Sequence, residues 1–182
     1  MDALELLLTR RSCAALKAPA PEGEALDTIL KAAVRVPDHR ALKPYEFILV
    51  KDDGLDRLGA LLEKAAVASG QPPDIVKRAS KLPHRAPLIV IVVAKARKTS
   101  PMELFEQRLT AGCAVMAMQM AAVALGFGGI WRTGWPVFDR NVHDALGLGP
   151  DDQIVGFLYL GTPAVVPNPA TPVDPANYSR WL

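Results

Sequence analysis

Apolar residues recur at intervals of three and four over several segments of the chain, which predicts amphipathic helices. One such segment follows Asp52 or Asp53, either of which is a good N-cap residue, and its apolar face is Leu55, Leu58, Leu62, Ala65 and Ala66. Pro37 stops the helix before it, because the residue preceding a proline disfavours helical backbone. The pattern predicts helices at residues 2–9, 24–36, 53–66, 74–80, 102–125 and 139–146.

Three other segments read as strands. Residues 87–94 are continuously apolar and mostly β-branched, which is typical of a strand covered on both faces. Residues 45–51 alternate loosely between apolar and polar, and residues 153–161 form the last predicted strand. Helices and strands follow one another without regular βαβ spacing, so we expect an α+β fold with a single central β-sheet flanked by helices.

The stretch from Ala111 to Ile130 contains no charged residue and no histidine. It is long enough to cross a bilayer, but Ala and Gly predominate and Gln119 lies in its middle. We therefore expect the innermost helix of a soluble protein, or a helix packed against its twin in a second copy. The chain leaves this helix through the segment 126–134, whose glycines predict a loose backbone where a ligand can bind.

Composition narrows the class of protein. A chain of 182 residues fits a single domain over 1–182, and 50% hydrophobic against 22% charged residues favours apolar surface buried between subunits. A net charge of +2 gives no basic stripe for nucleic acid. Two cysteines and an acidic start without a cleavage site predict a reduced, cytoplasmic protein. From residue 163 to 182 repeated prolines predict an extended tail that lies across a surface, such as a partner subunit.

Several common active-site motifs are missing from the sequence. It has no Gly-x-Ser-x-Gly elbow, no phosphate loop and no histidine pair at metal-ligand spacing, so we expect no metal site. Gly126-x-Gly128-Gly129 follows a predicted helix rather than a strand, the reverse of the dinucleotide-binding fingerprint. Redox or other demanding chemistry would belong to a bound organic cofactor.

Polar clusters supply the candidate binding residues. Arg10-Arg11-Ser12 offers two guanidinium forks and a hydroxyl to a phosphate or polyhydroxyl chain, or simply complements the dipole of the helix that it ends. In the loop 35–44, His39 either donates to a ring carbonyl or is a turn residue. The basic group Lys77, Arg78, Lys81, His84 and Arg85 is either a solvated face or a contact for an anionic cofactor or substrate.

Trp131-Arg132-Thr133 is the last of these clusters. The Trp131 ring either stacks on a ligand or packs in the hydrophobic core. Arg132 beside it needs a partner if its guanidinium is buried.

The order and spacing of these segments resemble the FMN-dependent nitroreductases, and most closely their short bacterial NAD(P)H nitroreductase subgroup. The similarity runs nearly end to end. The matching segments are Arg10-Arg11-Ser12, Pro37-Asp38-His39 with Pro44-Tyr45, Ala111-Gly-Cys-Ala114, Gly128-Gly129-Ile-Trp-Arg132 and Gly156-Phe-Leu-Tyr-Leu-Gly-Thr-Pro163.

The resemblance implies an intertwined homodimer of nitroreductase-like domains with two FMN sites, each built from both chains. One chain would supply Arg10, Arg11, Ser12, Trp131, Arg132 and Thr133, and the partner Arg35 and His39. The nicotinamide nucleotide would meet Ala121, Ala122, Val123, Ala124, Leu125 and Gly126. A cation near the flavin pyrimidine, Lys43 or Arg35, would stabilise the anionic reduced ring.

The activity implied by the resemblance is that of an oxidoreductase. Hydride passes from NADH or NADPH to flavin N5, and a nitroaromatic, a quinone or a similar flat acceptor is reduced in a second, ping-pong step. No side chain is then needed as a catalytic acid. The alternatives are a flavin-holding or interaction protein with little turnover, and a family member with other flavin chemistry such as reductive dehalogenation or flavin cleavage.

Overall fold

Strand β5 (Gln153–Pro163) organises a five-stranded sheet in which every pairing is antiparallel. One edge of β5 pairs with β3 (Leu88–Ala94), which in turn pairs with β2 (Tyr45–Lys51). The other edge pairs with β4 (Gly128–Arg132) and then with the short β1 (Leu16–Lys17). The computed structural model describes residues 2–165, 167–169 and 171–182.

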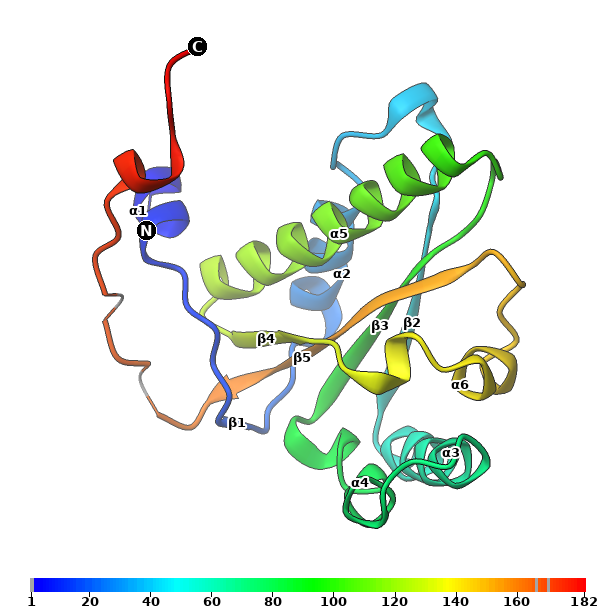
Figure 1. The fold of residues 1–182 in the computed structure, drawn as a ribbon. Coiled ribbons are helices and arrows are strands. Elements are labelled where there is room, and N and C mark those ends of the chain that lie inside the picture. The colour runs from blue at the N-terminus through cyan, green and yellow to red at the C-terminus, as the bar shows by residue number, and fades with distance from the viewer. Residues whose placement is uncertain (1, 166, 170) are drawn as a thin grey trace.

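Helices cover both faces of this sheet (Figure 1). On one face lie α2 (Gly23–Ala33) and α5 (Pro101–Ala124), and on the other α3 (Asp53–Ala68), α4 (Pro73–Ala79) and α6 (Arg140–Ala145). All seven residues of β3 are buried, as a strand between two helical layers requires. The predicted α+β architecture with one sheet flanked by helices is confirmed.

Short elements complete the chain. Before β1 lies α1 (Ala3–Thr9), whose N-cap Asp2 accepts a hydrogen bond from the Glu5 backbone N–H at 2.8 Å. The 3₁₀ turns are η1 (His39–Ala41), η2 (Pro83–Arg85), η3 (Trp135–Val137) and η4 (Pro175–Tyr178).

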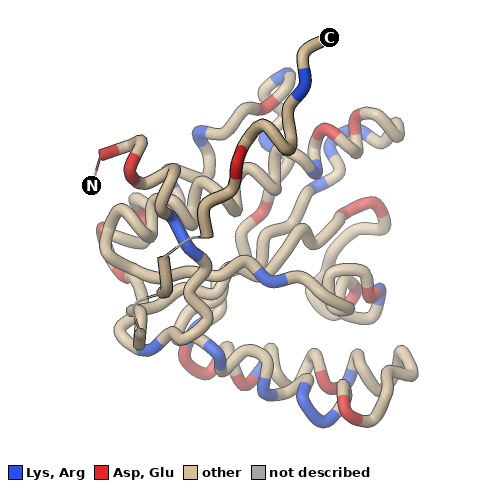
Figure 2. Tube along the Cα trace, turned by 60° about the vertical axis from the view of Figure 1, so that its left-hand side comes forward, with Lys and Arg blue, Asp and Glu red and all other residues tan. Residues whose placement is uncertain are grey.

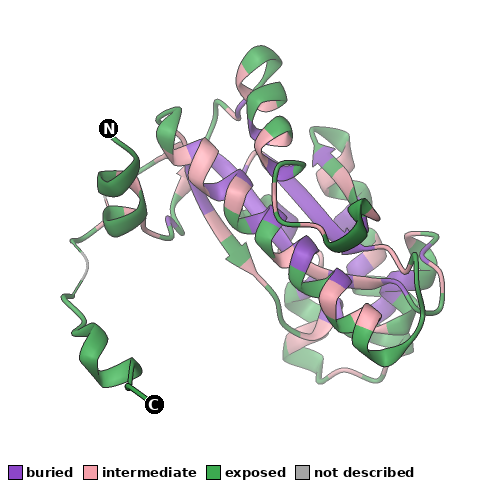
Figure 3. Cartoon of the chain, turned by 90° about the horizontal axis from the view of Figure 1, so that it is seen from above, coloured by how far each residue is buried: buried purple, intermediate pink, exposed green. Residues whose placement is uncertain are grey.

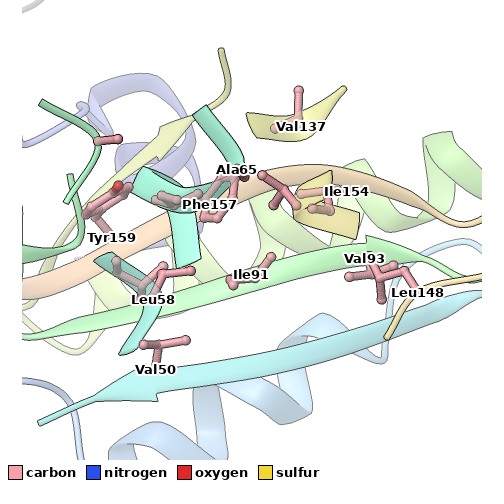
Figure 4. Close-up of a cluster of buried hydrophobic side chains, with 14 of the residues drawn as sticks. Val50, Leu58, Ala65, Ile91, Val93, Val137, Leu148, Ile154, Phe157 and Tyr159 are labelled. Atoms are coloured by element: carbon pink, nitrogen blue, oxygen red, sulfur yellow. The ribbon is translucent and has the colours of Figure 1, made fainter. Parts of the chain in front are cut away.

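Alternation along the strands divides the core into two clusters. Figure 4 shows the cluster on the α3 side, where Leu58 from α3 packs with Ile91, Phe157 and Tyr159 from the sheet. The second cluster lies between the sheet and the pair α2 and α5, and Leu158 and Leu160 belong to it. Residues of β5 thus point in turn to either side, so the register of this strand decides which layer each side chain joins.

Helix α5 is only half covered within the chain. One side of it is buried against the sheet and α2, whereas Phe105, Leu109 and Met116 on the other side are exposed by 62%, 53% and 38% (Figure 3). The uncharged stretch singled out in the sequence comprises the end of α5 and most of β4. Among the described residues, no helix has both the length and the apolar character that crossing a bilayer takes.

The structure differs from the sequence-based expectation around Gly128. The segment 126–134 was expected to be a loosened exit from the long helix, yet its centre is strand β4. A Cβ on Gly128 would lie 2.8 Å from Leu16, and one on Gly129 would lie 3.0 Å from Leu160. Glycine is thus needed for close packing rather than for looseness. The second helix also ends at Ala33, three residues before the predicted Val36.

A buried carboxylate joins the end of β3 to the loop before β5. Asp152, 7% exposed, forms an ion pair with Lys95 and accepts hydrogen bonds from the backbone N–H groups of Ala96 at 2.9 Å and Gly149 at 2.8 Å. Burial by itself raises the pKa of Asp152, but the bonds from Lys95 and the two N–H groups outweigh it and bring the pKa below the ordinary 3.8.

Replacing Asp152 by Asn is expected to lower the free energy of unfolding at pH 7 by about 2–4 kcal/mol, since Lys95 and two N–H groups lose a charged acceptor. Because the folded pKa is depressed, the carboxylate stabilises the native state above the unfolded value and loses this contribution as pH falls through the folded pKa. Urea unfolding at pH 7 and pH 3.5, at one protein concentration, measures both effects.

The matched control is Asp151→Asn, which changes an exposed neighbouring carboxylate. It is expected to shift the free energy of unfolding by no more than about 0.5 kcal/mol. Equal losses of unfolding free energy in the two variants would contradict this account. So would an Asp152→Asn protein whose free energy of unfolding still falls between pH 7 and pH 3.5 as much as that of the wild type.

Candidate functional site

Arg10, Arg11 and Ser12 follow α1 and enter the fold beside β4. The Cys13 backbone N–H donates to the Gly129 carbonyl at 2.9 Å, which ties this segment to the sheet. The Arg10–Ser12 segment therefore lies at the end of the molecule where α5 finishes (Figure 1).

A cavity of about 250 Å³ lies at this end, and we call it the Arg10 cavity. Its lining includes Arg10 and Arg11 together with Val123 and Gly126 from the end of α5. It thus brings the residues predicted to hold a phosphate next to part of the segment predicted to meet a nicotinamide nucleotide. Ser12 and the remaining residues of that segment, Ala121, Ala122, Ala124 and Leu125, do not line it.

The Arg11 guanidinium has no protein partner for one of its donors. Its Nη1 atom is buried and makes no hydrogen bond within the described residues, and no carboxylate lines the Arg10 cavity. A buried N–H of a charged group is costly without an acceptor. The residues present therefore fit an oxyanion such as a phosphate group.

Trp131 and Arg132 point to opposite faces of the sheet. In the β4–β5 register Trp131 lies opposite Leu158, on the α5 side, and Arg132 lies opposite Phe157, on the α3 side. The Trp131 indole packs closely over the backbone of Gly156, and its Nε1 donates to the Val155 carbonyl at 3.1 Å. Although held in this way, Trp131 remains 38% exposed.

Arg132 lies against the ring of Tyr159, with its guanidinium carbon 5.8 Å from the ring centroid. Its Nε atom is buried and has no hydrogen-bond partner within the described residues. Burial raises the pKa of the Tyr159 hydroxyl, and the charges of Arg85 and Arg132 offset part of that rise. Two cations therefore act on one hydroxyl on this side of the sheet.

Two adjoining cavities open beside Arg132. The Trp135 cavity, of about 170 Å³, is lined by Ile75, Arg78, Gly134 and Trp135. The Tyr159 cavity, of about 40 Å³, is lined by Leu62, Arg132, Phe157 and Tyr159. Both are also lined by Leu82, Arg85, Thr133 and Pro136. Neither shares a described lining residue with the Arg10 cavity, so the predicted FMN residues of a single chain do not line one common cavity.

Arg35 and His39 lie away from all three cavities. They are exposed in the connection between α2 and β2, which lies near the start of α5, at the opposite end from Arg10 (Figure 1). The turn that carries His39 is shaped by Asp38, whose carboxylate accepts from the N–H groups of Leu42 at 3.1 Å and Lys43 at 2.7 Å.

Left-handed backbone marks the same turn. Arg40, Ala41 and Lys43 have φ values of 63°, 51° and 49°. Non-glycine residues rarely adopt these angles, and such strain persists only where surrounding contacts hold it. The Asp38 carboxylate supplies those contacts, so the turn is a defined shape that presents His39 outward.

Sequence reasoning left the role of Arg85 open and missed Tyr159 and Trp135. Within the basic group 77–85, Arg78 and Arg85 line the Trp135 cavity, while His84 lies 3.2 Å from Asp56. The alternation of β5 indicates that Tyr159 faces one helical layer, but not which distant arginines meet it there. Figure 2 shows Lys and Arg interspersed with Asp and Glu along most of the chain, so composition alone does not single out these cations.

The chain is similar in sequence to proteins of one known family. A sequence model of the Nitroreductase family matches residues 7–162. The protein "Putative NAD(P)H nitroreductase YdjA" of Escherichia coli (strain K12) is 49% identical over 183 residues, covering 100% of both chains. A "Putative NAD(P)H nitroreductase" of Haemophilus influenzae is 40% identical over 163 residues, 89% of each chain.

Solved structures share the fold. A nitroreductase-like family protein from Bacillus cereus superposes with a TM-score of 0.85 at 20% identity, covering 100% of this chain and 96% of that one. A protein from Desulfovibrio desulfuricans described as "a putative nitroreductase in complex with fmn" has a TM-score of 0.78 at 22% identity, covering 98% of this chain and 96% of that one.

Two glycines next to the Trp131 indole allow the contribution of its packing to stability to be tested. A methyl group on Gly156 would overlap the indole, whereas one on Gly112 would meet the ring edge at an ordinary 3.6 Å. We expect Gly156→Ala to lower the free energy of unfolding by about 1–3 kcal/mol, because it displaces the ring and breaks its bond to Val155.

Gly112→Ala is the control, and it is expected to be neutral or stabilising by up to about 1 kcal/mol through helix propensity. Urea unfolding and near-ultraviolet circular dichroism measure stability and the environment of the indole. A loss of equal size in both variants would show that the packing of Trp131 is not the cause.

Proposed function

The chain belongs to the nitroreductase family, and on that premise we propose that it is an FMN-dependent oxidoreductase that uses NADH or NADPH to reduce flat acceptors such as nitroaromatics or quinones. The observation that carries the proposal is the Arg10 cavity, which is lined both by the end of α5 and by Arg11, whose buried Nη1 has no acceptor among the described residues. The names of the two relatives and the FMN complex of the D. desulfuricans protein support the choice of cofactors.

Each cluster of polar residues would take a separate part of the ligands. Arg10, Arg11 and Ser12 would hold the phosphate and ribityl chain, because guanidinium forks match phosphate oxygens. The backbone of Trp131 and Arg132 and the hydroxyl of Thr133 would face the flavin ring, since the two side chains diverge. The segment 121–126 would meet the nicotinamide nucleotide.

When bound, FMN supplies the redox chemistry: acceptance of a hydride from NAD(P)H and then reduction of the acceptor, in the two half-reactions of a ping-pong mechanism. The chain's own residues bind and orient the reactants and surround them with fixed charge. The two free cysteines, Cys13 and Cys113, agree with the reducing conditions of the cytoplasm.

We further propose an intertwined homodimer in which Arg35 and His39 complete the partner's site. Within one chain the connection between α2 and β2 contacts the first half of α5, whereas Arg10 lines a cavity at the end of α5, so a second copy would bring Arg35 and His39 there. Three exposed apolar features would be covered in such a dimer: the α5 side with Phe105, Leu109 and Met116, the leucines of α1, and Tyr178 and Trp181 of the tail (Figure 3). The tail, 163–182, belongs to the same single domain and would lie across the surface of the partner subunit.

Purified protein is expected to be yellow with one FMN per chain, and anaerobic NADH or NADPH should bleach its absorbance. Arg11→Gln should raise the Kd for FMN by about 10–100-fold, because a charged fork to the phosphate is lost. Flavin fluorescence titration measures the Kd, and stopped-flow absorbance measures the bleaching.

Arg57→Gln, which alters an exposed arginine on α3, is the control and should leave the Kd for FMN unchanged. A colourless protein that takes up no FMN contradicts the proposed function. Bound flavin that neither nucleotide bleaches would instead favour a flavin-holding protein with little turnover.

The dimer is tested at Leu109, which is 53% exposed within the chain. Leu109→Glu should convert the dimer to a monomer and weaken FMN binding with it, because a carboxylate would be buried at the interface. Size-exclusion chromatography with light scattering gives the mass. Val67→Glu, at a 63% exposed position on α3, should stay dimeric, and a monomeric wild type would refute the proposal.

A further inference from the structure

Arg85 lines both cavities beside Arg132 and has no counter-charge among the described residues. Its neighbours are paired, Arg78 with Asp74 and His84 with Asp56, whereas Arg85 forms no ion pair with the described part of the chain. The described residues that line the Trp135 and Tyr159 cavities include no Asp or Glu. An anion that enters would meet uncompensated positive charge.

Three residues that carry N–H or O–H donors, Arg85, Arg132 and Tyr159, line the Tyr159 cavity. The Arg132 Nε atom is buried and has no partner among the described residues, and the charges of Arg85 and Arg132 both act on the pKa of the Tyr159 hydroxyl. At about 40 Å³ the space suits a group as small as a carboxylate rather than a ring. Charge-assisted hydrogen bonds from guanidinium to carboxylate are among the strongest in proteins.

The adjoining Trp135 cavity is larger and mainly apolar. At about 170 Å³ it suits one aromatic ring, and Ile75, Leu82 and Trp135 offer it apolar contact. The two cavities share Arg85 and Thr133, so a ring in one places its substituent in the other.

We propose that Arg85 and Arg132 form a subsite for the carboxylate of a single-ring aromatic acceptor, whose ring lies in the Trp135 cavity. The proposal rests on the proposed function, because it names the class of acceptor at that same redox site. Thr133 lines both cavities and belongs to the segment proposed to face the flavin, so the acceptor ring would lie beside the cofactor.

The reaction leaves the carboxylate unchanged. In the two-electron step, 4-nitrobenzoate, NAD(P)H and one proton give 4-nitrosobenzoate, NAD(P)⁺ and water. The carboxylate therefore serves recognition alone, and removing its partner should affect binding of the acid without altering the redox reaction of neutral acceptors.

The test compares 4-nitrobenzoate with its neutral isostere 4-nitrobenzamide. Isothermal titration calorimetry on the purified holoenzyme, without nucleotide, is expected to give a Kd for the acid at least about 10-fold below that for the amide. In Arg85→Gln the Kd of the acid should rise by about 10-fold or more, while that of the amide changes less than about 2-fold. In turnover, the KM for the acid should rise with little change in kcat.

Lys81→Gln is the matched control, since Lys81 is an exposed cation of the same segment that lines neither cavity. Both Kd values should be unchanged in this variant. Equal Kd values for acid and amide in the wild type, or equal losses of both in Arg85→Gln, overturn the subsite.

A second arm identifies the source of the anion. Adenosine 2′-monophosphate should not compete with 4-nitrobenzoate, and competition abolished by Arg85→Gln would assign the subsite to NADPH and overturn the proposal. FMN content and anaerobic bleaching are recorded on the same samples. Normal bleaching without discrimination between acid and amide disproves the subsite alone, whereas protein that takes up no FMN disproves the proposed function.

Discussion

The placement of the candidate site residues depends on the pairing of β5 with its neighbours. This strand pairs with β3 on one edge and with β4 and β1 on the other, so it sets the register for both halves of the sheet. The pairing Trp131↔Leu158 and Arg132↔Phe157 sends the indole towards α5 and the guanidinium towards α3. A slip by one residue would exchange the two, because side chains alternate with a period of two.

The chain keeps two arginines at separate cavities that each have one buried nitrogen without an acceptor among the described residues, Arg11 at Nη1 and Arg132 at Nε. Unpaired buried donors oppose folding, so a sequence under selection for stability alone would pair or remove them. Elsewhere the chain does pair its buried charge, as Lys95 and Asp152 show. The contrast is what marks the two cavities as places for an anionic ligand.

Much of the fold was predictable because its signals are long and regular. The β-branched run that became β3 and the 3.6-residue period of α3 predicted elements close to those observed. Strand β4 was missed because Gly128 and Gly129 have little intrinsic preference for strands. What makes them a strand is their pairing with Gly161 and Leu160 of β5, residues that are distant in the sequence.

The candidate site was predictable only in part, for a similar reason. Arginines and a tryptophan beside serine and threonine could be chosen by residue type and by resemblance, as with Arg10 and Trp131. The meeting of Arg85, Arg132 and Tyr159 joins three distant segments of the chain. No local pattern carries that information, because the fold alone brings residues of η2, β4 and β5 to one cavity.

Helix α1 has a consequence for how the protein behaves at low concentration. It has seven residues and buries none of them within the chain, and so short a helix is not stable by itself in water. The backbone of Arg10 and Arg11 leads directly out of it. If assembly is what orders α1, dilution below the concentration needed for assembly will lower the affinity of Arg10 and Arg11 for a phosphate. The apparent affinity for the prosthetic group will then depend on the protein concentration.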